Sequence, residues 1–382
     1  MADSRPLSRA SIEAAYALIQ PRVHTTPVLT SRTLNNIAST PQSAESLAGS
    51  PFEGRPPARP KINLFFKCEN FQKICAFKAR GAFHAVLRLC ESLGVDAVRA
   101  RGVVTHSSGN HAQALALAAH SLNIPAYIVM PRISTPAKIA GTKAYGAKVI
   151  FSGSTSSERE EVVRQVVADT NAILVPPYDH PDIVLGQGTV GLELERQVRD
   201  MVRDNPDLSV HSNRMGQLDA VITPLGGGGL NSGLATWFAS EDSSSMKKTL
   251  VFGAEPSFEG ADDCRRSLAS GTRITAVSTL TIADGLRTPV GDVPWSVISN
   301  PDKVRAVYSV TEDQIKDAMR LVLERMKIVI EPSAAVGLAV VLFNEEFREL
   351  AEKEGGVDGW NMGVVFSGGN TSIEAITKLF GN

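Results

Sequence analysis

The 382-residue sequence has few cysteines, few aromatic residues and almost no net charge. Its four cysteines, Cys68, Cys75, Cys90 and Cys264, show no CxxC spacing, which argues against a structural zinc site and against a disulfide scaffold. We expect buried thiols in a reducing compartment and therefore a cytoplasmic protein. The formal net charge of -1 excludes an electrostatic preference for nucleic acid or for an anionic membrane.

Long apolar runs are also missing. No run is long enough to span a bilayer, and the N-terminal segment lacks the uninterrupted apolar core of a signal peptide. A hydrophobic content of 43% nevertheless allows a large core, and the chain is longer than one core usually organises. We therefore expect an enzyme-sized protein of two lobes whose partners are small molecules, not nucleic acid or membrane.

Short apolar or β-branched runs alternate with helical segments along most of the chain. This alternation predicts a mainly parallel sheet wrapped by helices, and two such series predict two sheets. A helix is expected from Ser8 to Ile19. Residues 38–60, rich in Ser, Pro, Ala and Gly, are expected to form a flexible surface loop without an element of their own. The expected strands are 62–69, 102–108, 126–130, 148–153, 219–225, 249–256 and 361–368.

Four consecutive glycines follow one expected strand and precede a helix. Backbone N–H groups at a helix N-terminus can cradle a phosphate. No Gly-Lys-Ser/Thr follows, as in a Walker A loop, and no acidic residue completes a dinucleotide fingerprint. A flexible turn is the alternative. The glycines are Gly226, Gly227, Gly228 and Gly229.

Polar residues also mark other strand-to-helix turns. SSGNHAQA (107–114) can surround an anion or a carboxylate, although Ser108 and Asn110 are equally good helix caps. In VVFSGGN (364–370) the glycines let a ligand approach and the Ser367 hydroxyl can face a heterocyclic nitrogen, although an ordinary turn explains the pattern as well.

Lys78 stands at the start of an expected helix, beside Phe77. A desolvated lysine has a lowered pKa and becomes a competent amine for Schiff-base chemistry. A single lysine is usually a solvated surface residue, so this interpretation depends on the other segments.

Taken together and in this order, these segments resemble the fold-type II pyridoxal-phosphate enzymes, and within them the serine racemase and serine/threonine dehydratase branch. The similarity covers Ser8 to Asn370, and it includes FFKCENFQK, FKARGA, VVTHSSGNHAQALALAA, GGGGLNSG, AEPS, ADDC, TIADGL, ERMKIVIEPSAAVG and SGGN. It implies an α/β fold of two parallel-sheet lobes with the cofactor between them. The large lobe would be residues 1–101 and 180–382, the small mobile lobe residues 102–179, and the assembly a homodimer.

The resemblance implies a role for each residue. Lys78 would form the Schiff base with pyridoxal phosphate and move protons on one face of the cofactor, and Ser108 would be the acid/base on the other face. The residues around the substrate carboxylate would be Ser107, Ser108, Asn110, His111 and Arg159.

The same resemblance assigns the cofactor contacts. Phe77 would lie against the ring, Asn110 would hydrogen-bond the phenolic oxygen, and Gly226 to Gly229 would bind the phosphate. Ser367 would meet the pyridine nitrogen, where a neutral hydroxyl makes a weaker electron sink than a carboxylate and suits expulsion of a β-leaving group.

A divalent-cation site of the family maps onto the carboxylates of Glu255 and Asp263 and the carbonyl of Ala261. Oxygen ligands suit magnesium, calcium or manganese. From the residues alone, a solvated acidic loop is the alternative. The loop has two residues more than the related mammalian pattern.

Mammalian members of the family bind ATP at a subunit interface, and Lys73, Gln113 and Lys327 match positions that line this site. Arg32 stands where a small hydroxyl residue is usual. The arginine either blocks a nucleotide or adds a phosphate contact.

The implied activity is serine racemisation together with L-serine ammonia-lyase activity, which yields D-serine, pyruvate and ammonia. A dedicated dehydratase of L-threonine or L-threo-3-hydroxyaspartate would share every residue named. A non-catalytic protein that binds vitamin B6 or an amino acid is disfavoured by the retention of Lys78, Ser108 and the glycine loop.

Overall fold

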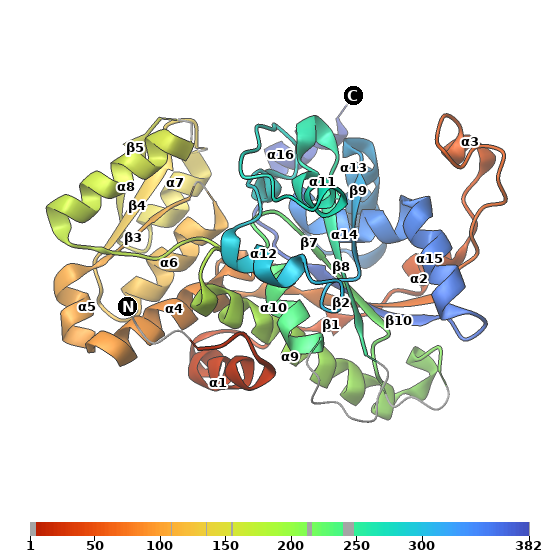
Figure 1. The fold of residues 1–382 in the computed structure, drawn as a ribbon, viewed down its shortest axis with the longest axis horizontal. Helices are drawn as coiled ribbons and strands as arrows, with labels where there is room; N and C mark the ends of the chain where they lie inside the picture. The colour runs from red at the N-terminus through yellow and green to blue at the C-terminus, as the bar shows by residue number, and fades with distance from the viewer. Residues whose placement is uncertain are drawn as a thin grey trace.

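Two separate sheets organise the chain into two α/β lobes that lie side by side (Figure 1). The structure is a computed structural model, and it describes residues 5–107, 109–134, 136–153, 156–211, 216–239 and 248–381. The expected α/β class with two sheets is confirmed.

The larger sheet has six strands in the order β1-β2-β10-β7-β8-β9. Only the β1–β2 pair is antiparallel among these neighbours. Every residue of β10 is buried, as expected for a central strand covered on both faces. The strands are β1 (Val28–Leu29), β2 (Ile62–Cys68), β7 (Ala220–Pro224), β8 (Leu250–Pro256), β9 (Ala306–Val310) and β10 (Trp360–Phe366).

Each face of this sheet has its own hydrophobic core, because successive side chains of a strand point to opposite faces. Ile222 and Val364 belong to the core that includes α14, an apolar helix buried along its length. Val221 and Val365 belong to the core that includes α9 and α10. The helices are α9 (Pro181–Asp204), α10 (Gly229–Phe238) and α14 (Pro332–Phe343).

The smaller sheet has four parallel strands in the order β5-β4-β3-β6. One helix, α4, packs against both α9 of the large lobe and α6 of the small lobe, so the lobes share it. The small-lobe elements are β3 (Val103–His106), α6 (Asn110–His120), β4 (Ala126–Pro131), α7 (Pro136–Lys143), β5 (Lys148–Ser152), α8 (Ser156–Thr170) and β6 (Ile173–Leu174). They are preceded by α4 (Lys78–Leu93) and α5 (Val95–Arg101).

The remaining helices cover the edges and ends of the large sheet. The expected first helix is present as α1, which Ser8 caps by accepting the N–H of Ser11. These helices are α1 (Arg9–Ile19), α2 (Arg32–Ser39), α3 (Ala44–Leu47), α11 (Asp263–Ser270), α12 (Asp292–Ile298), α13 (Glu312–Leu321), α15 (Glu345–Gly355) and α16 (Ile373–Phe380). Short turns are η1 (Gln20–Arg22), η2 (Glu69–Phe71), η3 (Lys73–Cys75), η4 (Pro206–Leu208), η5 (Phe258–Gly260), η6 (Asp284–Leu286) and η7 (Val322–Met326).

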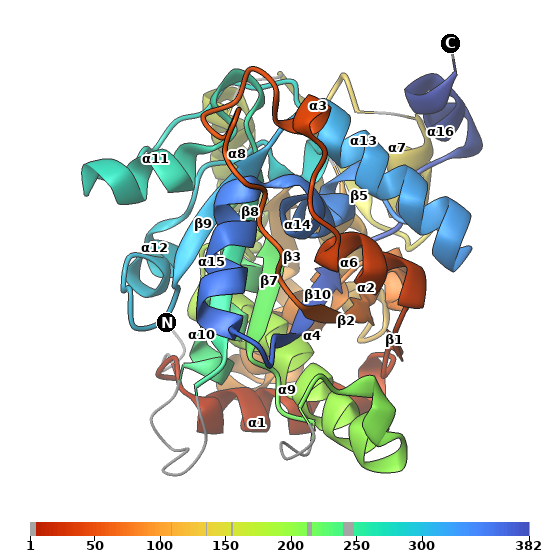
Figure 2. The ribbon, with the colours of Figure 1, turned by 90° about the vertical axis from the view of Figure 1, so that its right-hand side faces the viewer.

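Residues 38–60, which include α3, project from the large lobe at the right of Figure 1 and face the viewer in Figure 2, yet they are tied to the lobe. Buried Arg348 on α15 donates to the carbonyl of Ala38 at 2.8 Å, and its neighbour Glu345 accepts the N–H of Ala58 at 2.5 Å. The segment also contains the end of α2 and the short helix α3. The expectation of a loop without an element of its own is therefore wrong, because two buried charged side chains anchor both its ends.

All four cysteines are free. Cys68 and Cys264 are buried as expected, but Cys90 is half-buried and Cys75 is exposed. Cys75 lies in a left-handed turn, with φ of 54°, at the surface end of η3. The expectation of four buried thiols is wrong at this turn.

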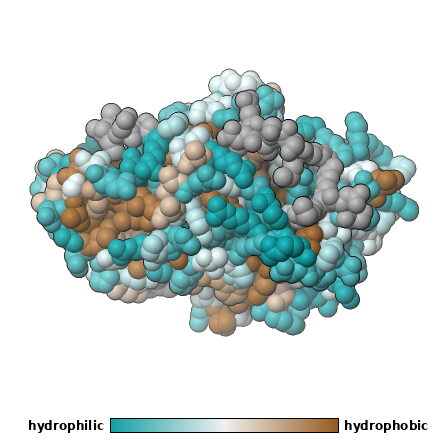
Figure 3. Space-filling view, turned by 90° about the horizontal axis from the view of Figure 1, so that it is seen from below, coloured by the Kyte–Doolittle hydropathy of each residue, from teal (hydrophilic) through white to brown (hydrophobic). Residues whose placement is uncertain are grey.

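The surface is mixed in polarity. Seen from below, apolar side chains gather in patches on the side of the small lobe, and polar side chains cover much of the rest (Figure 3). No helix in the described part of the chain combines the length and the apolar character needed to cross a bilayer.

Candidate active site

The amine of Lys78 lies between two aromatic rings at the start of α4. It donates to the carbonyl of Pro177 at 2.7 Å, and it lies 5.2 Å from the Phe77 ring centroid and 6.0 Å from that of Tyr178. Burial lowers the pKa of Lys78 to about 8. About a tenth of the amine is therefore unprotonated at pH 7, and this free base is the nucleophilic form that Schiff-base formation needs.

The turn that carries Lys78 is fixed to the end of β10. Ala76 pairs with Gly368 in an isolated bridge, and the Phe77 N–H donates to the carbonyl of Ser367 at 3.0 Å. Ser367 itself is buried. Phe77, Lys78 and Ser367, which the sequence places almost 290 residues apart, thus share one site.

A network of buried, oppositely charged side chains anchors α4 to its neighbouring elements. The guanidinium of Arg80 forms two bonds of 2.8 Å with Glu69 and bonds of 2.9 and 2.8 Å with Glu193. Lys67 donates to the same Glu193 at 2.7 Å. All four side chains are at most 3% exposed, and two cations balance two carboxylates. This network joins β2, α4 and α9.

The network changes the ionisation of its members in the expected directions. Burial alone would raise the pKa of Glu193, but the hydrogen bonds and charges of Arg80 and Lys67 hold it below its usual value. Burial lowers the pKa of Lys67, against the attraction of Glu69 and Glu193. Sequence reasoning missed the network because its members have no common local pattern.

The glycine loop lies between β7 and α10, where no side chain fits. A Cβ on Gly227 would lie 2.3 Å from the Tyr178 ring, and one on Gly226 would lie 2.9 Å from the Cα of Leu286. Gly228 caps α10 with φ of 86°, a backbone conformation that side chains disfavour. The loop leaves backbone N–H groups at the helix N-terminus, and Tyr178 connects it to Lys78.

A chain of amide hydrogen bonds borders the site opposite the glycine loop. Asn110, the first residue of α6, donates from Nδ2 to Oε1 of Glu331 at 2.9 Å. Its Oδ1 accepts from Asn370 at 2.8 Å, and Asn370 also donates to the carbonyl of Ile74. Asn110 is therefore held between the end of β10 and the start of α14. Burial raises the pKa of Glu331 to about 8.

Glu331 was not among the site residues expected from the sequence. In the sequence it is a single acidic residue before a proline at a helix start, which is a weak signal for a functional residue. The surrounding segment, ERMKIVIEPSAAVG, was used only as part of the family resemblance.

The expected substrate contacts lie near the carboxyl end of β3, as far as they are described. The Ser107 hydroxyl accepts the N–H of Gly109 at 3.3 Å, and Ser108 lies outside the described residues. His111 is buried, with Nε2 at 3.2 Å from the carbonyl of Val175. Burial and then the charge of Lys78 lower the pKa of His111 to about 3. His111 is therefore neutral and offers hydrogen bonding without positive charge.

Arg159, on α8, faces the same region. Burial and then the charge of Arg159 lower the pKa of His106. The same charge opposes the rise that burial causes in the pKa of Tyr178. A cation is thus placed near both residues, where a carboxylate would be attracted.

Two of the three expected cation ligands lie near each other: Glu255 is in β8, and Asp263, whose charge acts on it, is the first residue of α11. Glu255 accepts the N–H of Cys264 at 3.0 Å and that of Arg265 at 2.9 Å, and Asp263 accepts the N–H of Val290 at 3.3 Å. Burial, and then the charge of Asp263, raise the pKa of Glu255, and burial raises the pKa of Asp263 to about 6. No cluster of three His, Cys, Asp or Glu side chains occurs in the described residues, so a carbonyl such as that of Ala261 would have to complete a site.

The expected nucleotide residues are not brought together by any described contact. Lys73 lies in η3, which packs against α6, and Gln113 lies against Gly141 of α7. Lys327 is exposed after η7 with φ of 61°, and Arg32 is exposed on α2.

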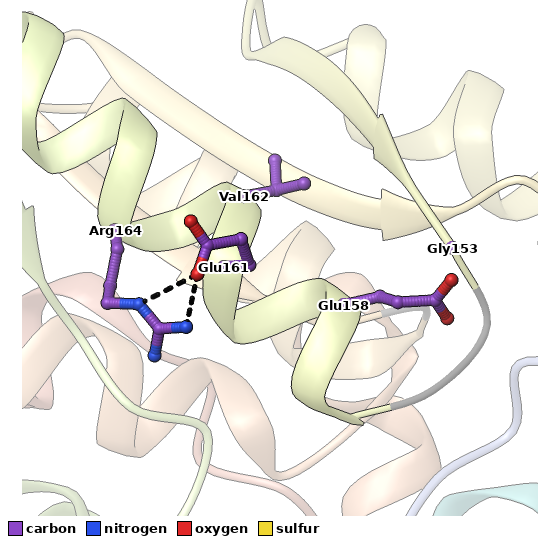
Figure 4. A pocket seen from close by; sticks show the side chains of 5 residues that line it. All are labelled: Gly153, Glu158, Glu161, Val162 and Arg164. Atoms are coloured by element: carbon purple, nitrogen blue, oxygen red, sulfur yellow. Dashed lines mark hydrogen bonds and ion pairs between the residues drawn. The ribbon is translucent and has the colours of Figure 1, made fainter.

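An open pocket on α8 is separate from these residues (Figure 4). Arg164 pairs with Glu161, and Glu158 points toward Gly153. Exposed ion pairs of this kind contribute little to stability, and none of the expected active-site residues lines the pocket.

The comparisons with known proteins identify the family. A family described as pyridoxal-phosphate dependent enzyme matches residues 50–368. The chain belongs to this family. Serine racemase of Arabidopsis thaliana is 41% identical over 372 residues, which cover 97% of this chain and 95% of that protein. L-threo-3-hydroxyaspartate ammonia-lyase of Saccharomyces cerevisiae is 38% identical, with 94% and 92% covered.

A solved member of the family has the same architecture. Serine racemase from Dictyostelium discoideum matches with a TM-score of 0.76 and 37% identity, and the match covers 96% of this chain and 99% of that one. The expected fold class, that of the fold-type II pyridoxal-phosphate enzymes, is thereby confirmed, and the chain is an enzyme that uses pyridoxal phosphate.

Proposed function

We propose that the protein is a serine racemase that gives D-serine and that also acts as an L-serine ammonia-lyase. In the second reaction the β-hydroxyl group leaves as water, and hydrolysis of the unsaturated product takes up one water to give pyruvate and ammonia. The observation that carries this proposal is the amine of Lys78, which has a lowered pKa and lies beside Tyr178, the residue that covers the glycine loop. The serine racemases among the relatives support the substrate.

The described residues fit the family's cofactor. Lys78 would hold it covalently, and Phe77 and Ser367 would flank its ring. The loop of Gly226 to Gly229, which a Cβ would fill, would hold the phosphate, and Asn110 would meet the phenolic oxygen. When bound, the cofactor supplies an electron sink for the charge left at Cα of the substrate.

The protein would supply acids and bases on both faces of that carbon. Lys78, whose pKa is about 8, suits removal and return of a proton near neutral pH. Ser108 is the proposed donor to the opposite face. Elimination needs only the Lys78 face and a proton for the departing hydroxyl. Ser107, Asn110, His111 and Arg159 would orient the substrate carboxylate.

Closure of the small lobe would exclude water from the substrate. We assign residues 102–179 to this mobile lobe and residues 1–101 and 180–382 to the large lobe. Lys138 of α7 forms an ion pair with Asp284 of η6, a contact across the two lobes that supports such closure.

We further propose that Glu255, Asp263 and the carbonyl of Ala261 bind magnesium, calcium or manganese. Burial raises the pKa of both carboxyl groups, and the charge of Asp263 raises that of Glu255 further; a bound cation would favour the ionised form of both.

A homodimer is proposed from exposed apolar side chains, among them Phe71 and Val329 at 46% and Ile373 at 75% exposure. We also propose ATP as an effector that binds near Lys73, Gln113 and Lys327. The family resemblance supports this site, and so do the two lysines, whose positive charges suit phosphate. Cytoplasmic residence is supported by the four free cysteines.

A dedicated dehydratase is the second candidate, and the hydroxyaspartate ammonia-lyase from yeast favours it. Incubation with L-serine, L-threonine and L-threo-3-hydroxyaspartate, followed by chiral chromatography and keto-acid assay, separates the two. D-serine that disappears in Ser108→Ala, while cofactor remains bound, would support the racemase. Keto acid without D-serine in the wild type would instead establish the dehydratase.

A further inference from the structure

Glu331 is a buried carboxyl group at the centre of the candidate site. It is 5% exposed, and its Oε1 accepts from Asn110 at 2.9 Å. A Cβ on Gly368, next to Ser367, would lie 2.9 Å from the same oxygen. The carboxyl group therefore touches both segments that would border the cofactor ring.

Glu331 differs from the other buried glutamates of the site. Glu69 and Glu193 are balanced by the cations Arg80 and Lys67, whereas no Lys, Arg or His of the described residues forms an ion pair with Glu331. The charged groups that act on it are Asp284 of η6 and Lys138 of α7, and these two pair with each other. Among the described residues, the groups that stabilise a negative charge on Glu331 by hydrogen bonding are the Asn110 amide and the backbone N–H of Asn370, and both are uncharged.

We propose that Glu331 is a positioning residue that holds Asn110 for the cofactor, and that it does so as an uncharged carboxylic acid. This inference rests on the proposed cofactor site. Asn110 has two Nδ2 hydrogens, and one bond to Glu331 leaves the second hydrogen for the phenolic oxygen. An ionised Glu331 would put two anions on one amide group, where they repel each other at low dielectric.

The pH dependence follows from this repulsion. Burial, and secondly the charge of Asp284, raise the pKa of Glu331 to about 8, against the pull of Asn110 and Lys138. An anionic phenolic oxygen on the bound cofactor would raise the pKa of Glu331 further. Above that pH, ionised Glu331 increases the proton affinity of the phenolic oxygen, and the visible absorbance of the bound cofactor changes.

The test compares Glu331→Gln, Glu331→Ala and Asn110→Ala in the holoenzyme. Their visible spectra are recorded between about pH 6 and 10, and cofactor affinity is measured by equilibrium dialysis. Glu331→Gln keeps an acceptor for Asn110 without a titrating proton. The Glu331 side chain makes no capping bond to α14, so its removal leaves that helix intact. Glu349→Gln, on α15 at the surface, is the matched control.

We expect a spectral transition at or above pH 8 in the wild type and in Glu349→Gln, and none in Glu331→Gln. Glu331→Ala should weaken cofactor affinity about 10-fold, as Asn110→Ala does, because one hydrogen bond is lost. An identical spectral transition in the wild type and in Glu331→Gln would overturn the proposal that Glu331 is an uncharged acid. Wild-type affinity in Glu331→Ala, with weakened affinity in Asn110→Ala, would overturn the positioning role. A wild type without any visible band would refute the cofactor site itself, and both proposals with it.

Discussion

The backbone N–H of Phe77 donates to the carbonyl of Ser367 at 3.0 Å, so the turn before Lys78 cannot move without the end of β10. The amine and the proposed partner of the pyridine nitrogen are therefore placed by one backbone contact. Because main-chain groups make this contact, side-chain substitutions at Phe77 leave it in place.

Gly227→Ala should weaken cofactor binding strongly. Its new Cβ would lie 2.3 Å from the Tyr178 ring, which must move into the site or away from Lys78. Spectroscopic titration with cofactor measures the loss, and Tyr178→Ala in the same chain should restore part of the affinity. Gly337→Ala is the matched control, because its Cβ would lie at an ordinary 3.6 Å from Ile222 inside α14. Equal affinity in both single variants would show that the loop tolerates a side chain.

Arg80→Met should destabilise the fold by about 3–5 kcal/mol, because buried Glu69 loses its cation and buried Glu193 keeps only Lys67. Urea unfolding of the cofactor-free protein measures this change. Arg203→Met removes an exposed ion pair with Asp200 and should have little effect. Similar unfolding midpoints for the two variants would contradict the structural importance of the network.

Glu331→Gln should raise the stability of the cofactor-free protein at alkaline pH. The pKa of Glu331 is about 8 in the folded state and near its ordinary value of 4.5 in the unfolded chain. The unfolded chain releases this proton first, so the wild type loses stability as pH rises from 4.5 to about 8, by up to ~1.4 kcal/mol per pH unit. Unfolding curves should nearly coincide near the lower pH and diverge at the higher one. A constant difference at both pH values would argue against the raised pKa.

Cation binding should strengthen as pH rises through about 6, the pKa of Asp263, because a cation needs the ionised carboxylate. Calorimetric titration with magnesium chloride on either side of this pH measures the effect. Asp263→Asn should abolish this increase in cation binding with pH. Asp262→Asn, at a partly exposed neighbour paired with Arg266, should retain the increase. Binding that is independent of pH and of Asp263 would place the cation elsewhere.

The strands and the glycine loop were predictable because their signals are local. Expected strands coincide with β2, β3, β4, β5, β7, β8 and β10, where apolar runs end in turn residues. The long helix α9 was missed, since Gly186, Gly188 and Gly191 interrupt its pattern. These glycines are required by packing: a Cβ on Gly186 would lie 2.7 Å from the Cα of Gly81 on α4.

The supporting residues of the site could not be predicted in the same way. The side-chain partners of Arg80 come from η2 and α9, and Glu331 meets Asn110 across more than 200 residues of sequence. Each of these residues, taken alone, is an ordinary charged side chain. Only the folded chain shows that they are buried, because burial depends on which elements become neighbours.

The balanced charges of the network around Arg80 also determine which effects can change the pKa of the Lys78 amine at the start of α4. Two cations and two carboxylates leave no net charge there, and burial alone accounts for the lowered pKa of Lys78. Hydration is therefore the variable that sets the proton affinity of this amine. Removal of water from around this amine makes its free base easier to form, so closure of the small lobe would favour the unprotonated lysine.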